Sequence, residues 1–313
     1  MSAPTRAGAG EPLPLRALAP AKINLGLCVG PARADGRHEL VSAMQSISLA
    51  DELTLEYAPP EVERDEIVCA GVDGENLAAR ALALFRAATG WDAEPLRLRI
   101  DKRIPVAAGL GGGSADAAAA LRLAHAASGL GDMDLLFVLA AQLGADVPAQ
   151  VIPGRRLASG AGETLEVQPD PVTPFGVLVL AQASGLSTAA VYAEADRLAL
   201  ARDAYSLQRR RDALRTALEL GAALPGRACL LHNDLQAAAI ALCPQIEPAL
   251  AQALEAGAEV AFVSGSGPTV VGLFARANGL ARASRAAAGL QGRAPAPLTA
   301  EPVGAGFGGV RRA

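Results

Sequence analysis

The feature that most constrains this chain is a glycine-rich stretch, Gly109-Leu110-Gly111-Gly112-Gly113, which separates two segments of opposite pattern. The segment before it, 96–100, alternates apolar and polar side chains, and this predicts a β-strand. The segment after it is rich in alanine and leucine as far as Ser128, and this predicts a helix. The glycines therefore connect a strand to the N-terminus of a helix.

A glycine turn at a helix N-terminus is a favourable place for an anion. The first amides of a helix have no partner within it, the peptide dipole is positive there, and glycine lets an anion approach the backbone. A tight turn in a narrow space is the alternative, and it would explain one or two glycines. Four glycines in five positions, followed by Ser114 as a helix cap or a metal ligand, favour phosphate binding. The chain has no Gly-Lys pair, so this is not a Walker loop and the lysine must come from elsewhere.

A second glycine pattern, 304–309, has the G-x-G-x-x-G spacing of dinucleotide-binding motifs. Only residues 310–313 follow it, and they are too few for the helix that such a motif requires. We interpret this pattern as a flexible tail.

The composition indicates a folded protein of two domains. The chain has 313 residues, of which 51% are hydrophobic, and this is ample for buried cores. Short alanine-rich periodic segments alternate with short β-like runs, which indicates an α/β or α+β class. A formal net charge of −4 and an aromatic content of 3% give nucleic-acid binding little support, so we expect no nucleic-acid partner.

Other features bear on location. Residues 1–14 mix proline, glycine and both charge signs without an apolar core, and they predict a disordered leader rather than a signal peptide. No apolar run is long enough to span a bilayer, so we expect a cytoplasmic protein with no membrane partner. The cysteines show no C-x-x-C pair and no histidine at metal-ligand spacing, and we expect four buried thiols: Cys28, Cys69, Cys229 and Cys243.

Residues 15–29 predict a strand with two different faces. The apolar face should carry Ile23, Leu25 and Leu27. The opposite face should carry Lys22, Asn24 and Gly26. A lysine and an amide beside a glycine indicate either a solvated edge or one wall of a site, and the period of the pattern does not choose between them.

Polar residues also stand at the ends of other predicted elements. Asn76 should cap a helix over 76–85, and a helix over 134–143 should end at Gly144. Asp146 follows directly and precedes a proline, where a helical turn can begin. Three prolines between 169 and 174 mark a domain boundary, and a second Gly/Ser loop at 263–269 leads into a strand at 270–274.

Lys22, the glycine loop and Asp146 together fit one chemistry. Phosphoryl transfer needs the nucleotide phosphates held, their charge neutralised by Mg²⁺ and cationic groups, and the acceptor hydroxyl aimed in line. A carboxylate can take the proton of the acceptor, while a neighbouring lysine keeps that carboxylate ionised. The three pieces would suffice for an ATP-dependent kinase.

With these residues the chain resembles the GHMP kinase superfamily, and within it the members that act on a cytidine-diphosphate-linked methylerythritol. The glycine loop alone indicates only the superfamily, whereas the first strand and the Asp-Gly-x-His loop narrow the resemblance to these members. It covers nearly the whole chain after residue 14. The segments that carry it are 19–25, 33–40, 101–105, 109–118, 143–148 and 264–269.

The resemblance implies ATP-dependent phosphorylation of the 2-hydroxyl of 4-diphosphocytidyl-2-C-methyl-D-erythritol in the non-mevalonate isoprenoid pathway. It implies Lys22 and Asp146 as the catalytic pair, with Asp146 as general base, and Ser114 as a candidate Mg²⁺ ligand. The ATP triphosphate would be wrapped by Pro105, Val106, Ala107, Ala108, Gly109, Leu110, Gly111, Gly112, Gly113, Ser114 and Ala115. Near the nucleoside would lie Asn76, Leu77, Lys102 and Asp116. The substrate side would comprise Asn24, Arg37, His38, Thr188, Tyr192, Gly265 and Ser266.

The resemblance also implies an α/β architecture of the two-domain GHMP kinase type. An N-terminal ATP-binding domain would span 15–170 and a ferredoxin-like C-terminal domain 175–313, with the site in the cleft between them. The partner is a small molecule, and we expect a monomer or a weak homodimer.

Two positions depart from the usual pattern of the family. Arg37 stands where the family usually carries a tyrosine that stacks on cytosine, and a guanidinium plane can stack on a base as well. Asp116 stands where some relatives carry asparagine.

Two alternative functions remain open. A non-catalytic nucleotide-binding relative is one alternative, and a GHMP kinase for mevalonate, homoserine or a sugar is the other. Asp234 is interpreted as a helix cap and 209–211 as a solvated helix face.

Overall fold

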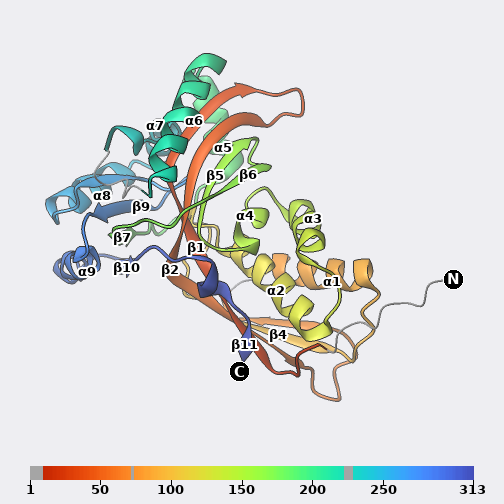
Figure 1. The fold of residues 1–313 in the computed structure, drawn as a ribbon. Coiled ribbons are helices and arrows are strands. Elements are labelled where there is room, and N and C mark those ends of the chain that lie inside the picture. Colours follow the sequence, from red (N-terminus) through yellow and green to blue (C-terminus); the bar gives the residue numbers. More distant parts are fainter. Residues whose placement is uncertain (1–9, 72–73, 222–227) are drawn as a thin grey trace.

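The computed structural model describes residues 10–71, 74–221 and 228–313, which form two sheets with their covering helices (Figure 1). The strands are β1 (Leu15–Ala32), β2 (His38–Tyr57), β3 (Glu66–Cys69), β4 (Leu96–Asp101), β5 (Arg155–Gly160), β6 (Thr164–Gln168), β7 (Gly176–Leu180), β8 (Val260–Val263), β9 (Val270–Phe274), β10 (Leu298–Ala300) and β11 (Arg311–Arg312). The α-helices are α1 (Leu77–Thr89), α2 (Gly112–Ser128), α3 (Met133–Leu143), α4 (Val147–Val151), α5 (Thr188–Arg197), α6 (Ala204–Glu219), α7 (Gln236–Leu242), α8 (Ile246–Glu255) and α9 (Gly279–Gly289). Two short 3-10 turns are η2 (Ala228–Leu230) and η3 (Ala305–Gly308).

The first sheet is organised on the long hairpin of β1 and β2. These strands pair antiparallel from Leu15 opposite Leu55 to Ala32 opposite His38. At the open end β2 pairs with β4, which pairs in parallel with β3, whereas towards the tip β2 pairs with β5. The order is β11-β1-β2-β4-β3, with β5 and β6 continuing from β2. One pair of strands thus runs the length of the sheet and reaches α6 at its far end (Figure 1).

A β-bulge in β1 reverses the alternation that the sequence predicts. The register shifts between Asn24 and Gly26. Before the shift, Lys22 and Asn24 line the cavity described below; after it, Leu27 lines this cavity, and a Cβ on Gly26 would lie 3.3 Å from Leu214 of α6. The prediction is right for Lys22 and Asn24 and wrong for Gly26 and Leu27, because one extra residue turns the side chains that directly follow it to the opposite face.

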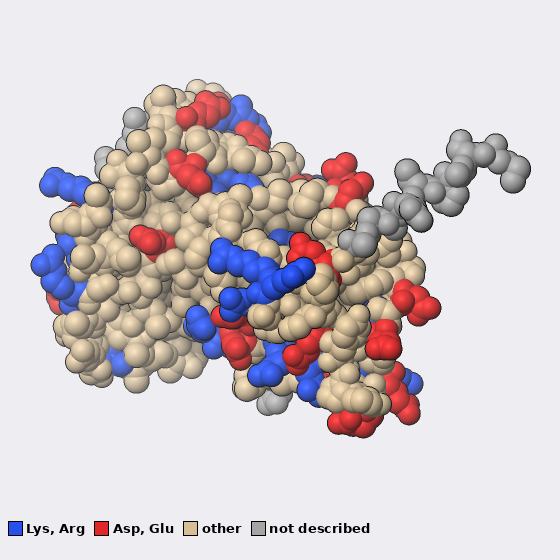
Figure 2. All heavy atoms as spheres, turned by 60° about the horizontal axis from the view of Figure 1, so that its bottom comes forward, with Lys and Arg blue, Asp and Glu red and all other residues tan. Residues whose placement is uncertain are grey.

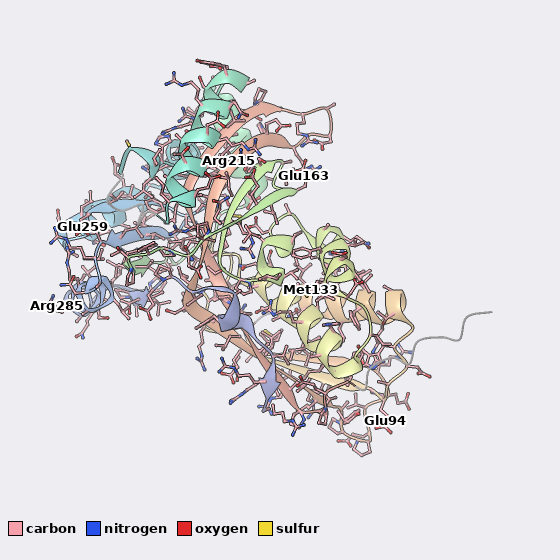
Figure 3. The ribbon with its side chains drawn as sticks, viewed as in Figure 1. Glu94, Met133, Glu163, Arg215, Glu259 and Arg285 are labelled. Carbon is pink, nitrogen blue, oxygen red and sulfur yellow. The ribbon has the colours of Figure 1, made fainter. Side chains whose placement is uncertain are left out.

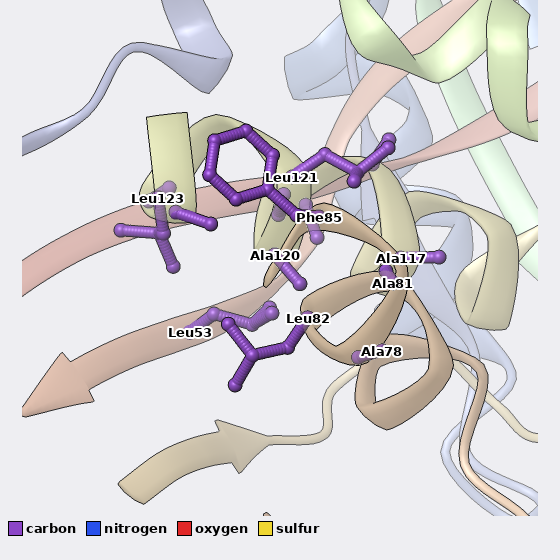
Figure 4. Packing of buried hydrophobic residues seen from close by; sticks show 14 of the residues in the cluster. Leu53, Ala78, Ala81, Leu82, Phe85, Ala117, Ala120, Leu121 and Leu123 are labelled. Atoms are coloured by element: carbon purple, nitrogen blue, oxygen red, sulfur yellow. The ribbon is translucent and has the colours of Figure 1, made fainter. Parts of the chain in front are cut away.

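Small side chains let α1 and α2 pack closely on the first sheet. Ala78 and Ala81 of α1 and Ala117 and Ala120 of α2 are at most 1% exposed and belong to one core cluster. Figure 4 shows these residues between the two helices, with Phe85 and leucines filling the space around them. The predicted Asn76 cap is confirmed, because its side chain accepts a hydrogen bond from the Ala78 amide. The helix continues beyond the predicted residue 85 to Thr89.

The second sheet has the order β10-β7-β9-β8 with antiparallel neighbours throughout. With helices between β7 and β8 and α9 between β9 and β10, this is the ferredoxin-like arrangement that the sequence predicts. The predicted boundary at 170–175 falls between β6 and β7, which belong to different sheets, and stays a prediction. Among the described helices none is by itself long and apolar enough to cross a membrane, although α7 and α8, bent by 120°, pass the same test as a pair.

Residues near both chain ends are held in place, contrary to expectation: those near the start contact α2, and those near the end pair with the first sheet. Residues 1–9 of the predicted leader lie outside the described residues, but the Glu11 amide donates to Ala126 O at 2.8 Å, so disorder is the wrong prediction for this part. The predicted flexible tail is also wrong. It forms η3 and then β11, whose Arg311 pairs with Arg16 of β1. Residues 301–313 therefore return to the first sheet, which the sequence division at 175–313 did not anticipate.

Arg122 of α2 holds this returning segment. Its guanidinium donates to Gly308 O at 3.0 Å and to Leu18 O at 2.9 Å, and also to Gln150 O at 2.7 Å and Val151 O at 3.3 Å at the end of α4. Burial lowers the pKa of Arg122 to about 10, so the group remains a cation at neutral pH. All the hydrogen-bond partners of Arg122 among the described residues are carbonyls, and a buried cation of this kind fits the C-terminal end of α4, where carbonyls lack helical donors.

The outer face of the first sheet carries charges of both signs. Arg16 lies 3.8 Å from Glu52, and Arg97 is paired with Glu66. Lysine and arginine side chains are interspersed with aspartate and glutamate on the face that Figure 2 shows.

Candidate functional site

A cavity of about 790 Å³ lies between the two halves of the molecule. Elements of both sheets contribute to it, because its lining comes from β1, β2, the glycine loop, α5 and the loop before β9. Of the predicted site residues, it is lined by Lys22, Asn24, Arg37, His38, Gly109, Gly111, Ser114, Asp146, Thr188, Tyr192, Gly265 and Ser266. Residues that the sequence suggests as nucleotide, acceptor and base contacts therefore share one space.

Lys22 is the buried cation of this cavity. Its side chain is 7% exposed, and its Nζ donates to Asn24 Oδ1 at 2.7 Å and lies 3.4 Å from Asp146 Oδ2. The Asn24 amide in turn donates to Ser42 Oγ at 2.7 Å, which fixes the amide oxygen toward the lysine. The Lys22 backbone amide donates to Leu110 O at 2.9 Å, so β1 is tied directly to the glycine loop. The interpretation of Lys22 as an exposed strand lysine does not hold.

Asp146 is the half-exposed anion beside it. It stands at the N-terminus of α4, which has a proline in its first turn as the sequence predicts. Its side chain is 45% exposed, so it can meet a ligand in the cavity while remaining 3.4 Å from the Lys22 ammonium.

The glycine loop contacts the second Gly/Ser loop by backbone against backbone. Gly109 has a φ of 74°, and a Cβ there would lie 2.7 Å from both Ser264 O and Gly267 O. The second loop is itself held by Asn233, whose amide donates to Val263 O and Gly265 O at 2.7 Å each. Only glycine permits this approach, so the two loops form one continuous wall.

Asp234, which follows Asn233, corrects one prediction. Asp234 does not cap α7; it accepts the Val29 amide at 2.9 Å and pairs with Arg202 and His232. The sequence could not separate these roles, because Asn233 and Asp234 are adjacent and both residue types favour helix caps.

The N-terminus of α2 opens without a side-chain cap. Gly111 is the N-cap residue and has a φ of 70°, and Ser114 stands inside the first turn. The prediction of Ser114 as the cap is therefore wrong. Amides at an uncapped helix start remain available to an anion.

A buried charge cluster lies behind the loop. Lys102 Nζ pairs with Asp51 and lies 2.8 Å from Asp116 Oδ2, while Asp51 Oδ1 accepts the amides of Arg103 at 2.6 Å and Ile104 at 2.8 Å. Burial raises the pKa of Asp116 to about 7; Lys102 opposes this rise and Asp51 adds to it. Burial alone would lower the pKa of Lys102, but the two carboxylates raise it above its usual value.

This cluster sets the position of the helix start. A Cβ on Gly112 would lie 3.3 Å from Lys102 Nζ, so the ammonium packs directly under the first turn of α2. The structure does not bring Lys102 and Asp116 into the cavity, nor the other two residues that the sequence places near the nucleoside, Asn76 and Leu77. The same holds for Pro105, Val106, Ala107, Ala108, Leu110, Gly112, Gly113 and Ala115. These assignments stay predictions.

Another side of the cavity is built around His38. Its side chain is 7% exposed, and its Nε2 lies 2.7 Å from Asp196 Oδ1. The Tyr192 ring centroid lies 5.1 Å from that of His38. Burial raises the pKa of Tyr192 to about 12, with the charge of Asp146 adding to the rise, so its hydroxyl stays protonated. At the other end of α5, Thr188 Oγ1 and Ser266 Oγ lie 3.0 Å apart.

Asp196 is the residue of this group that the sequence interpretation missed. It lines the cavity one helical turn after Tyr192, and this i, i+4 spacing within the predicted helix is the signal that could have found it.

Arg37 is engaged by its own turn. Its Nε and Nη2 donate to Asp35 Oδ2 at 3.1 and 2.9 Å, and its amide donates to Asp35 Oδ1 at 3.0 Å. These hydrogen bonds lower the pKa of Asp35, and they shape the turn that carries Arg37. Arg37 thus lines the cavity while its guanidinium is paired with a carboxylate.

Two hairpin tips meet at the rim of the cavity. Arg33 Nη1, after β1, donates to Glu163 Oε1 at 2.7 Å, and Glu163 Oε2 accepts the Ala161 amide at 2.6 Å. Figure 3 shows Glu163 at the β5–β6 turn, on the side of the β1–β2 hairpin tip. This contact ties the loop that carries Arg37 and His38 to the opposite rim.

Comparisons with known proteins agree with this geometry. Residues 76–154 match the family model for the GHMP kinases N terminal domain, and residues 204–292 match that for the GHMP kinases C terminal region. The chain is 41% identical over 286 residues to a 4-diphosphocytidyl-2-C-methyl-D-erythritol kinase of Anaeromyxobacter dehalogenans, covering 88% of this chain and 85% of that protein. It is 42% identical over 287 residues to the protein of the same name from Salinispora tropica, with 88% of each covered.

Solved structures give the same result. A crystal structure of 4-(cytidine 5'-diphospho)-2C-methyl-D-erythritol kinase matches with a TM-score of 0.73 and 33% identity, covering 92% of this chain and 99% of that one. A homoserine kinase from Cytophaga hutchinsonii matches with a TM-score of 0.68 at 16% identity, over 95% of this chain and 96% of that one. The second likeness shows the fold alone.

Proposed function

This chain belongs to the 4-diphosphocytidyl-2-C-methyl-D-erythritol kinase family of the GHMP kinases, and from this premise we propose that it transfers the γ-phosphoryl group of ATP to the 2-hydroxyl of 4-diphosphocytidyl-2-C-methyl-D-erythritol. The reaction would supply the non-mevalonate route to isoprenoid precursors. The observation that carries the proposal is the Lys22–Asp146 pair, 3.4 Å apart, in the cavity that Gly109 and Gly111 also line.

Asp146 accepts the proton of the acceptor hydroxyl. As the hydroxyl oxygen forms its bond to the γ-phosphorus, the bond from that phosphorus to the β–γ bridging oxygen breaks, the proton passes to the Asp146 carboxylate and ADP leaves. Lys22 lies 3.4 Å from this carboxylate and stabilises negative charge that develops at the transferring group. The lysine can do this because Asn24 and Leu110 O fix its side chain and its backbone.

The start of α2 holds the anionic end of the nucleotide. Its uncapped first-turn amides and its dipole attract phosphate oxygens, and glycine allows them to approach the backbone. Asp51 and Lys102 do not line the cavity. They pack behind the glycine loop and keep these amides in position.

The cavity also offers oxygen donors that suit Mg²⁺. Ser114 and Asp146 both line it, and hydroxyl and carboxylate oxygens, completed by phosphate oxygens, are ligands that Mg²⁺ accepts. When bound, the ion would neutralise phosphate charge. Within the described residues no group of three or more His, Cys, Asp or Glu could hold a metal ion.

A coupled ADP-release assay tests the function. The purified protein is given ATP and Mg²⁺ with the cytidyl-diphosphate substrate, mevalonate, homoserine or galactose in parallel. Turnover with the cytidyl substrate alone is expected. Turnover with another of the four acceptors would overturn the substrate assignment, and ATP binding without turnover of any would favour a non-catalytic relative.

A further inference from the structure

Asn233 is a buried asparagine that lies outside the lining of the cavity. It is 4% exposed, and the residues that line the cavity do not include it. Its Nδ2 donates to Val263 O and to Gly265 O at 2.7 Å each, and its Oδ1 accepts the Leu235 amide at 2.9 Å. Two carbonyls require a donor and one N–H requires an acceptor, so the partners fix which way the side-chain amide points.

The backbone of Asn233 is fixed by the strand that carries Lys22. Leu27 of β1 forms a parallel bridge with Asn233. The Leu27 amide donates to His232 O at 2.8 Å, and Leu27 O accepts the Asp234 amide at 2.9 Å. One strand therefore positions both the lysine and the residue that holds the 263–267 loop.

The 263–267 loop packs directly on this lysine. Gly265 has a φ of 58°, and a Cβ there would lie 3.3 Å from Lys22 Nζ and 3.3 Å from Asn24 Oδ1. The C=O and N–H of a trans peptide point in opposite directions, so with Gly265 O held by Asn233 the Ser266 N–H points away from it. This N–H donates to no described residue, and Ser266 lines the cavity. A donor without a protein partner thus belongs to a residue of the cavity wall.

We propose that Asn233 is a positioning residue for phosphoryl transfer: its side-chain amide holds the 263–267 loop against Lys22 and keeps the Ser266 amide free for an anionic oxygen of the bound reactants. This inference rests on the proposed function. Without the two donors of Asn233, the loop loses the contacts that orient its carbonyls and can move away from the lysine. A displacement of about 1 Å at a reacting group can cost a factor of about 10² in rate, even when the altered residue lies outside the site.

Asn233→Asp removes the donors and keeps the shape of the side chain. Its carboxylate can still accept the Leu235 amide, but at about pH 8 it offers no proton to the two loop carbonyls. We expect kcat/KM for the cytidyl-diphosphate acceptor to fall about tenfold or more. Asn233→Ala removes the donors without adding a charge and should act in the same direction, so it replaces Asn233→Asp if that variant does not fold.

ATP binding should be affected much less than turnover. The start of α2 is supported from behind by Lys102 and Asp51, and Asn233 does not contact it. We therefore expect the equilibrium affinity for ATP to change by less than about threefold in both variants.

Two further amide-to-carboxylate substitutions serve as comparisons. Gln236 binds the same loop with the opposite polarity, because its Oε1 accepts the Val263 amide at 3.0 Å. A carboxylate accepts this hydrogen bond as well, so Gln236→Glu should retain most of the turnover. Asn278 is exposed at the start of α9 and makes no capping hydrogen bond through its side chain, so Asn278→Asp controls for the added charge and should leave kcat/KM unchanged.

Hydrogen exchange tests the hold on the loop without using activity. In Asn233→Asp, measured well below its melting temperature, the amides of 263–269 should exchange faster than in the wild type, whereas those of β4 should not change. A merely structural role would lower the melting temperature and leave kcat/KM of the folded protein as it is.

Unchanged exchange at 263–269, or faster exchange with an unchanged kcat/KM, overturns the proposal. An equal loss of turnover in Gln236→Glu overturns it too, because the polarity of the contact would then not matter. Wild-type protein that does not phosphorylate the cytidyl substrate overturns the proposed function instead, and the exchange at 263–269 still decides whether Asn233 holds the loop.

Discussion

Gly111 lies over the side chain of Lys22: a Cβ added at Gly111 would be 3.0 Å from Lys22 Cγ and 3.2 Å from Cε. The same residue has a φ of 70°, a conformation that an L-residue with a side chain adopts only at a cost. The absence of a side chain at this position thus serves both the turn into α2 and the placement of the lysine.

Gly111→Ala should therefore reduce both stability and turnover. The left-handed conformation should cost about 1–2 kcal/mol of unfolding free energy, and the displaced ammonium should reduce kcat. Gly113→Ala is the matched stability control, since a Cβ there meets nothing within 4 Å and Gly113 is not in the left-handed region. Thermal unfolding of both variants checks the first effect, and equal melting temperatures would contradict it.

Asp146→Asn should separate binding from chemistry. An amide cannot take the acceptor proton, so kcat should fall by a factor of about 10² or more, while ATP affinity remains nearly unchanged. Steady-state kinetics and equilibrium ATP binding measure the two quantities. Asp134→Asn, an exposed acid in the first turn of α3, is the control and should leave both unchanged. Undiminished turnover in Asp146→Asn would remove this residue from the mechanism.

The raised pKa of Asp116, about 7, predicts a pH-dependent stability. Between about pH 4 and pH 7 the folded protein holds a proton on Asp116 that the unfolded chain has lost, so stability falls as the pH rises through this window. The melting temperature of the wild type relative to Asp116→Asn should thus decrease from about pH 5 to pH 8. A difference that is constant over this range would show that Asp116 does not titrate there.

Thiol reactivity should distinguish the cysteines, although the sequence predicted four buried ones. Cys229 is exposed and Cys69 is half-buried, whereas Cys28 and Cys243 are buried. Burial also raises the pKa of Cys28 and of Cys69, which lowers their thiolate fraction. A colorimetric disulfide reagent should label Cys229 first, and Cys28 and Cys243 only on unfolding. Cys229→Ser should abolish the fast phase; if that phase persists, another thiol is accessible.

Local signals in the sequence predicted the glycine loop and its flanking elements well. The alternation at 96–100 and the alanine run after Gly113 gave β4 and α2 because each pattern is set by a single periodic face. Asn76 was recognisable as a cap because its role depends on residues close in sequence. The Lys22 and Asp146 side chains, 124 positions apart, could be brought together only through the family resemblance.

What the sequence did not predict depends on contacts between distant elements. The β-bulge after Asn24 follows from how β1 pairs with β2, and no residue in β1 alone signals it. Asp196 acquires its role only because α5 packs beside the start of β2. Likewise η3 and β11 are ordered by Arg122 and by β1, and not by their own glycine-rich composition.

The short helix α4 has a contact at each end: Asp146 at its start lies beside Lys22, and the carbonyls at its end bind Arg122. Asp146, the proposed general base, stands at its start, and the carbonyls of Gln150 and Val151 at its end accept hydrogen bonds from the Arg122 guanidinium of α2, the helix whose start we propose holds the nucleotide. The proposed acceptor side and the proposed nucleotide side of the site are thereby connected through α4 and Arg122. The position of Asp146 relative to the start of α2 consequently depends on the packing of α4 against α2. A substitution that moves one of these two helices to fit a new substrate should therefore also move the other.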